Sequence, residues 1–387
     1  MSREFVYLDY AATTPVAPEV VDAMLACLGR KGSFANPASV HIAGRRSAAI
    51  IDAAREQLAA LLGTKPECLI WTSGATESNN LAIRGAANAR AHRGRHLISM
   101  RTEHKAVTDT FRALAKEGFE VTWLNPDRNG ALVVDELRQA IREDTQLVSV
   151  MHVNNETGAV QDIRAIGQLC RDRKVLFHTD AAQSVGKMDI DLDELPVDLL
   201  SLTGHKFYGP QGIGALFITD YGHCKVLPIA YGGGQEKRLR PGTLPVHLIA
   251  GLGAAAALAQ TERAENLRHV TALRQRLWAG IADVGGIVSN TPDADSYPGI
   301  LNVSSDGIDG ESLMLGMEPV CVASGSACNS TSGEASHVLR ALGRSDSEAQ
   351  AAVRFSFGRG SSEQDIDVAI ERYRYSVEHC RTLAPIP

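Results

Sequence analysis

Three polar segments, each placed directly after a short apolar run, hold the residue types of this sequence that are best suited to chemistry. The first, Thr72-Ser-Gly-Ala-Thr-Glu-Ser-Asn, is small, rich in hydroxyls and followed by a helical pattern. Free backbone N–H groups and the positive end of a helix at such a turn suit a phosphate group. The alternative is an ordinary helix cap that binds no ligand. The spacing of a Walker phosphate loop is absent from this segment.

The second and third segments place a carboxylate and an amine at the ends of apolar strands. Asp180, in His178-Thr-Asp-Ala-Ala-Gln183, ends such a strand, where an unpaired charge is costly. Its cationic partner is either a protonated pyridine nitrogen or an arginine or lysine elsewhere in the chain. Lys206, in Ser201-Leu-Thr-Gly-His-Lys, also ends a strand. Desolvation there frees the amine for a Schiff base, unless the side chain simply reaches out to solvent.

The order of these segments along the chain matches the needs of one cofactor. Parallel sheets bind ligands at the carboxyl ends of their strands, so the three segments are expected to meet there. Pyridoxal 5′-phosphate requires a lysine, an acid on its ring nitrogen and donors around its phosphate, and we predict that it binds here. His104, in Thr102-Glu-His-Lys, follows another expected strand. Its imidazole either stacks on the pyridine ring and moves protons or is structural.

Two further residues concern a substrate rather than the cofactor. Cys328 lies in Ala323-Ser-Gly-Ser-Ala-Cys-Asn-Ser-Thr-Ser, and a cysteine among small polar residues indicates an exposed loop and favours a reactive thiol. Arg354 alternates with apolar neighbours in Val353-Arg-Phe-Ser-Phe-Gly-Arg359. A fixed guanidinium there either holds a substrate carboxylate through two hydrogen bonds or forms a structural ion pair.

The elements that must position these residues alternate between strands and helices, which predicts an α/β fold with a mostly parallel sheet and helices on both faces. The expected strands are 68–72, 96–100, 146–153, 175–179, 199–203 and 215–219, and the expected helices include 48–62, 135–142, 163–173 and an apolar core helix at 248–259. After about Thr261 the pattern changes to a charged helix, 262–281, short strands at 300–303, 320–323 and 353–357, and a last helix capped by Ser362 and Asp365. We therefore expect a large cofactor-binding domain of residues 15–260. A smaller α+β domain would comprise residues 1–14 and 261–387 and carry the cysteine loop.

Composition excludes several classes of protein. The 387 residues are 44% hydrophobic and 22% charged, as in a globular protein with a large buried core. The net charge of −6 provides no basic field for nucleic acid, and no apolar run reaches membrane-spanning length. We expect a cytoplasmic protein with no direct nucleic-acid or membrane partner. The seven cysteines are scattered, so neither a disulfide framework nor a zinc site is expected, and the histidine spacing predicts no metal.

Together these motifs resemble those of group I cysteine desulfurases of the NifS/IscS type, members of the class V aminotransferase family with the fold type I of pyridoxal-phosphate enzymes. The resemblance covers nearly the whole chain. It rests on Tyr7-Leu-Asp-Tyr-Ala-Ala-Thr-Thr, Asn36-Pro-Ala-Ser, Thr72-Ser-Gly-Ala-Thr-Glu-Ser, Thr102-Glu-His-Lys, His152-Val-Asn-Asn-Glu-Thr-Gly, His178-Thr-Asp-Ala-Ala-Gln-Ser-Val-Gly-Lys, Gly204-His-Lys, Gly242-Thr-Leu-Pro, Ser324-Gly-Ser-Ala-Cys and Arg354-Phe-Ser-Phe-Gly-Arg. It implies a mostly parallel seven-stranded sheet flanked by helices, a smaller α+β domain, and a homodimer.

The resemblance also implies a role for each matching position. Lys206 holds the cofactor as a Schiff base, Asp180 pairs with its ring nitrogen, Gln183 bonds its ring hydroxyl oxygen, and His104 stacks on its ring and takes part in catalysis. The residues implied at the phosphate are Ala75, Thr76, Thr203, His205 and, from the second subunit of the dimer, Thr243. The residues implied at the substrate carboxylate are Asn155, which also contacts the cofactor, and Arg354.

The implied reaction converts L-cysteine to L-alanine and leaves the sulfur on Cys328 as a persulfide. An acceptor protein would then take the sulfur, either an iron–sulfur scaffold or an enzyme that thiolates tRNA or DNA. An aminotransferase or a selenocysteine lyase of the same fold would not need Cys328, and a non-catalytic sulfur-transfer subunit would not need Lys206, Asp180 and His104. Two departures stand out: Thr203 replaces a more usual serine, and Lys237-Arg-Leu-Arg-Pro stands where a glycine often follows the glutamate.

Overall fold

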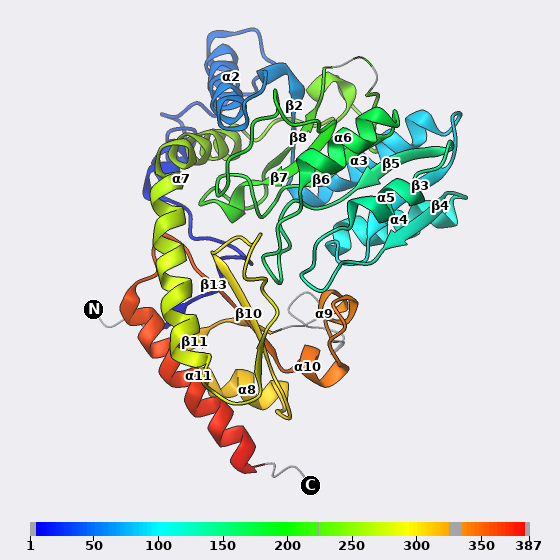
Figure 1. Cartoon of the computed structure of the whole chain (residues 1–387). Helices are drawn as coiled ribbons and strands as arrows, with labels where there is room; N and C mark the ends of the chain where they lie inside the picture. Colours follow the sequence, from blue (N-terminus) through cyan, green and yellow to red (C-terminus); the bar gives the residue numbers. More distant parts are fainter. Residues whose placement is uncertain (1–4, 221, 223, 325–334, 384–387) are drawn as a thin grey trace.

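A seven-stranded sheet lies in the upper part of the protein as Figure 1 shows it. The computed structural model describes residues 5–220, 222, 224–324 and 335–383. The strand order is β2-β8-β7-β6-β5-β3-β4. β8 runs antiparallel to both of its neighbours, and the other neighbouring strands are parallel, as the sequence predicted. The strands are β2 (Leu69–Thr72), β3 (His96–Met100), β4 (Glu120–Leu124), β5 (Thr145–Ser149), β6 (Leu176–Asp180), β7 (Leu199–Thr203) and β8 (Gly214–Ile218).

Each face of this sheet is covered by its own set of helices, because successive residues of a strand point to opposite faces. On β3, Ile98 belongs to the hydrophobic cluster that contains α1, α2, α5, α6 and the first half of α7 (Val246–Ile281). Leu97 belongs to the cluster of α3 and α4. Burial on both faces explains why the strands read as continuous apolar runs. The helices are α1 (Pro18–Leu25), α2 (Ile42–Leu62), α3 (Ala75–Arg90), α4 (Lys105–Lys116), α5 (Val134–Ala140) and α6 (Ile163–Asp172).

A separate hydrophobic cluster surrounds a four-stranded antiparallel sheet with the order β12-β13-β10-β9. Val6 and Leu8 of the N-terminal segment belong to this cluster, and β1 pairs in parallel with β11. The expected domain boundaries at residues 14 and 261 stay a prediction. The elements are β1 (Val6–Tyr7), β9 (Ile287–Ser289), β10 (Ile300–Ser305), α8 (Gly310–Gly316), β11 (Val320–Cys321), β12 (Ala323–Ser324), α9 (His337–Ala341), α10 (Asp346–Gln350), β13 (Ala352–Ser356) and α11 (Glu363–Leu383).

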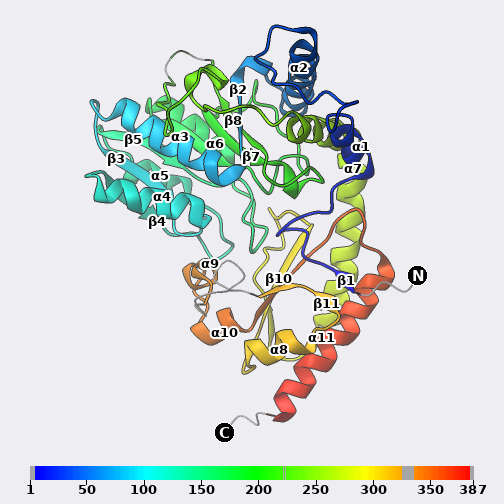
Figure 2. The same ribbon diagram turned by 180° about the vertical axis from the view of Figure 1, so that it is seen from behind.

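One continuous helix, α7 (Val246–Ile281), extends from the large sheet to the small one (Figures 1 and 2). The sequence predicted two helices here, because its composition changes from apolar to charged near Thr261. The change instead marks where the helix leaves one core and enters the other: Ile249 belongs to the large cluster and Leu277 to the small one. Despite its length, neither α7 nor any other described helix is apolar enough to cross a membrane.

The other differences from the expected elements are local. The expected strand 146–153 ends early, at Ser149, and the chain continues as a loop toward the site. The expected strand 320–323 is divided between β11 and β12, which belong to different sheets. β4 was not predicted, because this edge strand is buried only at Leu124 and lacks a continuous apolar run.

Candidate active site

A cavity of about 560 Å³ lies at the carboxyl ends of the parallel strands, where the three polar segments meet. It is lined by the turn after β2, the ends of β6 and β7, and residues 11–13 of the N-terminal segment. The residues singled out from the sequence that line it are Ala75, Thr76, His104, Asn155, Asp180, Gln183, Thr203, His205, Lys206 and Arg354. The fold thus brings together side chains that are far apart in the sequence.

The start of α3 forms one end of this cavity. Its N-cap, Gly74, provides no capping side chain and has a φ of 149°, in the region that favours glycine. A Cβ on Gly214 of β8 would lie 2.7 Å from the Cα of Gly74, so only a residue without a side chain allows this close approach. The turn therefore offers backbone N–H groups and the positive end of a helix to an anion.

Asp180 ends β6 and is 5% exposed. Its Oδ1 accepts a hydrogen bond from the backbone N–H of Ala182 at 2.9 Å, and its Oδ2 accepts one from Nδ2 of Asn79 at 2.7 Å. Both donors are neutral, so the buried carboxylate can still attract a cation from the cavity. This geometry favours a protonated ring nitrogen over a protein cation, the other possibility that the sequence left open.

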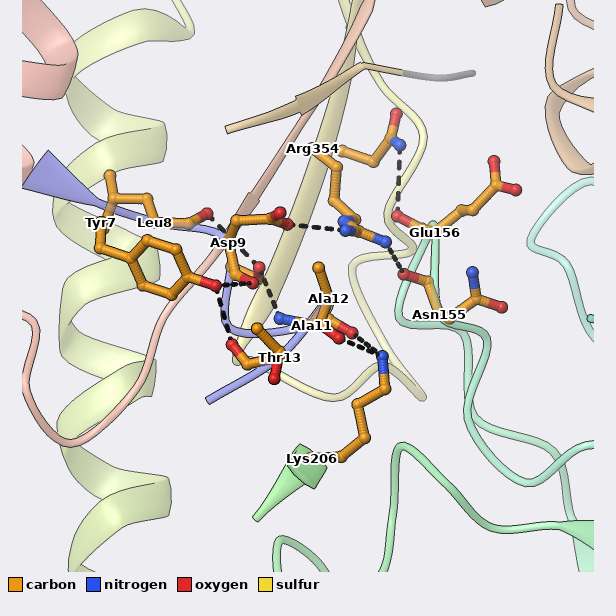
Figure 3. A network of polar contacts seen from close by, with 12 residues as sticks. Tyr7, Leu8, Asp9, Ala11, Ala12, Thr13, Asn155, Glu156, Lys206 and Arg354 are labelled. Atoms are coloured by element: carbon orange, nitrogen blue, oxygen red, sulfur yellow. Dashed lines mark hydrogen bonds and ion pairs between the residues drawn. The ribbon is translucent and has the colours of Figure 1, made fainter. Parts of the chain in front are cut away.

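Lys206 lies directly after β7, in the turn Gly204–Lys206. Its Nζ donates hydrogen bonds to the carbonyl oxygens of Ala11 at 2.6 Å and Ala12 at 2.7 Å (Figure 3). The amine therefore faces the N-terminal segment at the cavity wall rather than reaching away from the site. Beside it, burial and then the positive charge of Lys206 lower the pKa of His205 to about 4, which keeps this imidazole neutral near pH 7.

His104 is the N-cap of α4, and its Nδ1 accepts a hydrogen bond from the backbone N–H of Ala106 at 3.1 Å. The proton of the neutral ring is therefore on Nε2. Burial lowers the pKa of His104, although Asp180 acts in the opposite direction. A neutral imidazole that lines the cavity is suited both to stacking on an aromatic ring and to moving a proton.

The sequence offered two interpretations of Arg354, and the structure shows features of both. Nη2 of Arg354 forms an ion pair with Oδ1 of Asp9 at 2.7 Å, and Nη1 donates to the carbonyl oxygen of Asn155 at 2.8 Å (Figure 3). The guanidinium also lines the cavity, and its Nε has no hydrogen-bond partner among the described residues. The ion pair thus leaves donors for a further acceptor, because a guanidinium has five N–H groups.

One of the expected site residues does not line this cavity. Thr243 lines a separate hollow of about 240 Å³ with Asn36, Gln235 and others. Cys328 lies outside the described residues. No group of three or more histidine, cysteine, aspartate or glutamate side chains that could hold a metal is found in the described part of the chain.

Several residues that support the site were missed from the sequence. Asn79, which bonds Asp180, is the last residue of the polar segment that begins at Thr72, but it received no role of its own. Asp9 lies within the segment Tyr7-Leu-Asp-Tyr-Ala-Ala-Thr-Thr, which carried the resemblance but received no role. A carboxylate in an otherwise apolar segment was the available signal, because such a charge needs a partner. The contacts of Lys206 with Ala11 and Ala12 could not be predicted, because they involve backbone carbonyl groups and not side chains.

Comparison with known proteins gives a consistent result. The family model described as aminotransferase class-V matches residues 6–368. The cysteine desulfurase IscS of Pectobacterium atrosepticum is 50% identical over 382 residues, which cover 98% of this chain and 95% of that relative. A solved NifS-like protein superimposes with a TM-score of 0.90 at 33% identity and covers 97% of this chain and 100% of its own. A structure described as SspA in complex with cysteine gives a TM-score of 0.80 at 40% identity, with 91% and 98% coverage.

Proposed function

We propose that this chain, which belongs to the aminotransferase class-V family, is a cysteine desulfurase that converts L-cysteine to L-alanine and transfers the sulfur to Cys328. A relative with this activity in its name matches nearly the whole chain at 50% identity, and a similar structure is described as a complex with cysteine. Within the molecule, one observation carries the proposal. Lys206, Asp180, His104 and Arg354 line a single cavity at the carboxyl ends of the strands.

The side chains of this cavity fit pyridoxal 5′-phosphate. Asp180, bonded only by neutral donors among its described contacts, would pair with the ring nitrogen, and Lys206 would hold the cofactor. Gln183 donates one hydrogen from Nε2 to the carbonyl of Ala11 at 2.7 Å and keeps a second one for the ring hydroxyl oxygen. The groups that would hold the phosphate are Ala75 and Thr76 at the start of α3, together with Thr203 and His205. When bound, the cofactor withdraws electrons from the substrate and so loosens its Cβ–S bond.

The remaining residues of the cavity would orient the substrate and move protons. Arg354, with Asn155 beside it, would hold the carboxylate of L-cysteine through charge-assisted hydrogen bonds. His104 is neutral because burial lowers its pKa, so it can accept a proton and return it. The amine of Lys206 lies at the same wall and is a second group that can carry a proton.

Sulfur transfer requires a thiolate, which we assign to Cys328. The thiolate sulfur attacks the sulfur of the substrate and the new S–S bond forms as the substrate's Cβ–S bond breaks. The electron pair of the broken bond remains on Cβ, which takes up a proton and becomes the methyl group of L-alanine. The enzyme keeps the sulfur as a persulfide that an acceptor protein can remove. That acceptor would be an iron–sulfur scaffold or a thiolation enzyme in the cytoplasm.

We also propose that the active form is a homodimer in which Thr243 completes the phosphate site of the second subunit. Within its own chain Thr243 lines a different hollow, close to Asn36 and Pro37. Large apolar side chains around this region are exposed, including Phe34 at 63% and Val40 at 87%. An apolar surface of this kind favours contact with another protein surface.

The test is the release of sulfide and alanine from L-cysteine in the presence of a reductant. We expect the wild type to release both in equal amounts and Cys328→Ala to release neither while it keeps the visible absorbance of the cofactor. A Cys328→Ala variant as active as the wild type would instead indicate a lyase that needs no thiol. Lys206→Ala should lose the visible absorbance, and an unchanged spectrum would refute the cofactor assignment.

A further inference from the structure

The N-terminal segment before α1 is fixed against β13, the strand that carries Arg354. Ser356 of β13 donates its backbone N–H to the carbonyl of Leu8 at 2.7 Å, and the backbone N–H of Ala11 donates to Oγ of Ser356 at 2.8 Å. These bonds fix the backbone on either side of Asp9 (Figure 3). The position of Asp9 is therefore set by main-chain pairing and not by its side chain alone.

Among the described residues, the side chain of Asp9 contacts the site through Arg354. Its Oδ1 lies 2.7 Å from Nη2 of Arg354, and the two side chains are 22% and 6% exposed, respectively. Arg354 lines the cavity, whereas Asp9 does not. The second acceptor of the guanidinium is the neutral carbonyl of Asn155, at 2.8 Å from Nη1. Two acceptors on two different nitrogens fix the plane of the guanidinium, which a single one would leave free to rotate.

We propose that Asp9 is a positioning residue for substrate binding, because it fixes the guanidinium of Arg354 in the orientation that accepts the carboxylate of L-cysteine. This inference rests on the proposed function, in which Arg354 holds that carboxylate. Asp9 itself would not touch the substrate.

The same segment also reaches the residues that hold the cofactor. Two residues beyond Asp9, the carbonyl of Ala11 accepts a hydrogen bond from Lys206 at 2.6 Å (Figure 3). The same carbonyl accepts a second hydrogen bond from Gln183 at 2.7 Å. One short piece of backbone thus contacts both the carboxylate-binding group and the lysine. Its pairing with β13 sets the spacing between the two, which has to match the spacing between the carboxylate and amine of one amino acid.

Whether Asp9→Asn weakens or tightens carboxylate binding distinguishes a role of Asp9 in orienting Arg354 from a purely electrostatic effect of its charge. A negative charge beside Arg354 repels a substrate carboxylate, so on electrostatic grounds alone the Asp9→Asn substitution should tighten binding. If Asp9 orients the guanidinium, the same substitution should weaken binding, because an amide holds Arg354 less firmly than a carboxylate does. The two explanations therefore predict opposite changes in affinity.

The experiment measures the binding of L-alanine and of ethylamine to the cofactor-loaded enzyme from the change in visible absorbance. Ethylamine is L-alanine without its carboxylate, so it does not report on Arg354. For Asp9→Asn we expect about tenfold weaker binding of L-alanine, unchanged binding of ethylamine, and a raised KM for L-cysteine with kcat retained. The matched control is Glu262→Gln, which removes the ion pair between Glu262 and Arg359 at 2.9 Å, outside the cavity. It should change neither affinity.

Asp9→Asn that binds L-alanine as tightly as the wild type, or more tightly, would overturn the inference, as would equal losses for L-alanine and ethylamine. These outcomes leave the proposed function intact as long as the wild type still forms alanine from L-cysteine. A wild type without that activity would instead refute the proposed function. Asp9→Asn keeps an oxygen acceptor for the guanidinium and is preferred to Asp9→Ala, which removes the acceptor together with the charge and destabilises the fold.

Discussion

Replacing Glu236 by alanine is expected to destabilise the edge of the large sheet that leads into the turn before α3, the proposed phosphate site. β2 is the edge strand, and the carboxylate of Glu236 accepts a hydrogen bond from the backbone N–H of Trp71 at 2.7 Å. The same carboxylate accepts two hydrogen bonds from Arg55, at 2.7 Å from Nη2 and 3.1 Å from Nη1. The Glu236 side chain is 4% exposed, so this is a buried ion pair that also satisfies the sheet edge.

The expected cost follows from what each partner loses. Removing one member of a buried ion pair costs about 3–5 kcal/mol. Arg55 keeps a bond to the carbonyl of Leu69 at 2.6 Å and lies 5.0 Å from the centre of the Trp71 ring, so its charge is not left without neighbours. We therefore expect Glu236→Ala to lower the free energy of unfolding by about 3 kcal/mol, the lower end of that range.

Urea unfolding followed by tryptophan fluorescence measures this change. Glu120→Ala is the control, because the pair between Glu120 and Arg142 is exposed, with side chains 64% and 40% accessible. Surface pairs contribute little, so this control should hardly move the midpoint. Glu236→Ala should also need more cofactor for half-saturation, since β2 positions the turn. A midpoint for Glu236→Ala equal to that of Glu120→Ala would refute the reasoning.

Three further predictions follow from single sites. Burial lowers the pKa of His178 to about 3. At a pH between this value and the usual histidine pKa, the unfolded chain therefore binds a proton at His178 more readily than the folded one does. The free energy of unfolding should therefore hold above about pH 6.5 and fall progressively toward pH 3, and His178→Gln should flatten that fall; an unchanged slope would contradict the assignment. Arg238 has a φ of 66°, in the left-handed region that favours glycine, so Arg238→Gly should stabilise the fold by about 0.5–1 kcal/mol. A lower thermal midpoint would speak against strain there. A Cβ on Gly214 would lie 2.7 Å from the Cα of Gly74, so Gly214→Ala should weaken cofactor binding in an absorbance titration, whereas Gly285→Ala, with open space at its Cβ, should not. Equal affinities of these two variants would show that the close approach is unimportant.

The meeting of the strand-end residues could be predicted because it follows from local pattern and topology. Asp180 and Thr203 each end an apolar run, and the observed strands β6 and β7 end at these residues. Parallel strands bring their carboxyl ends to one edge, so residues at those ends come together without any knowledge of side-chain contacts. The strands of this sheet other than β4, and the meeting of these residues at one edge, could therefore be predicted from the sequence.

The contacts that hold these residues in place could not be predicted, because they join segments with no shared local pattern. Asp9 and Arg354 are 345 residues apart in the chain, and Asn79 and Asp180 are 101 apart. The N-terminal strand β1 is only two residues long, too short to carry a periodic signal. Such pairings depend on how the two hydrophobic clusters pack, which no single segment encodes.

The most direct test of the account is the fate of the sulfur in one turnover without reductant. After incubation with L-cysteine, peptide mass spectrometry locates any added sulfur while amino-acid analysis counts the alanine formed. We expect one alanine per subunit and one extra sulfur atom, which fragmentation of the peptide that contains both Cys321 and Cys328 places on Cys328, and none on the six other cysteines. Alanine formed without added sulfur on Cys328, or with the sulfur on a different cysteine, would contradict the account.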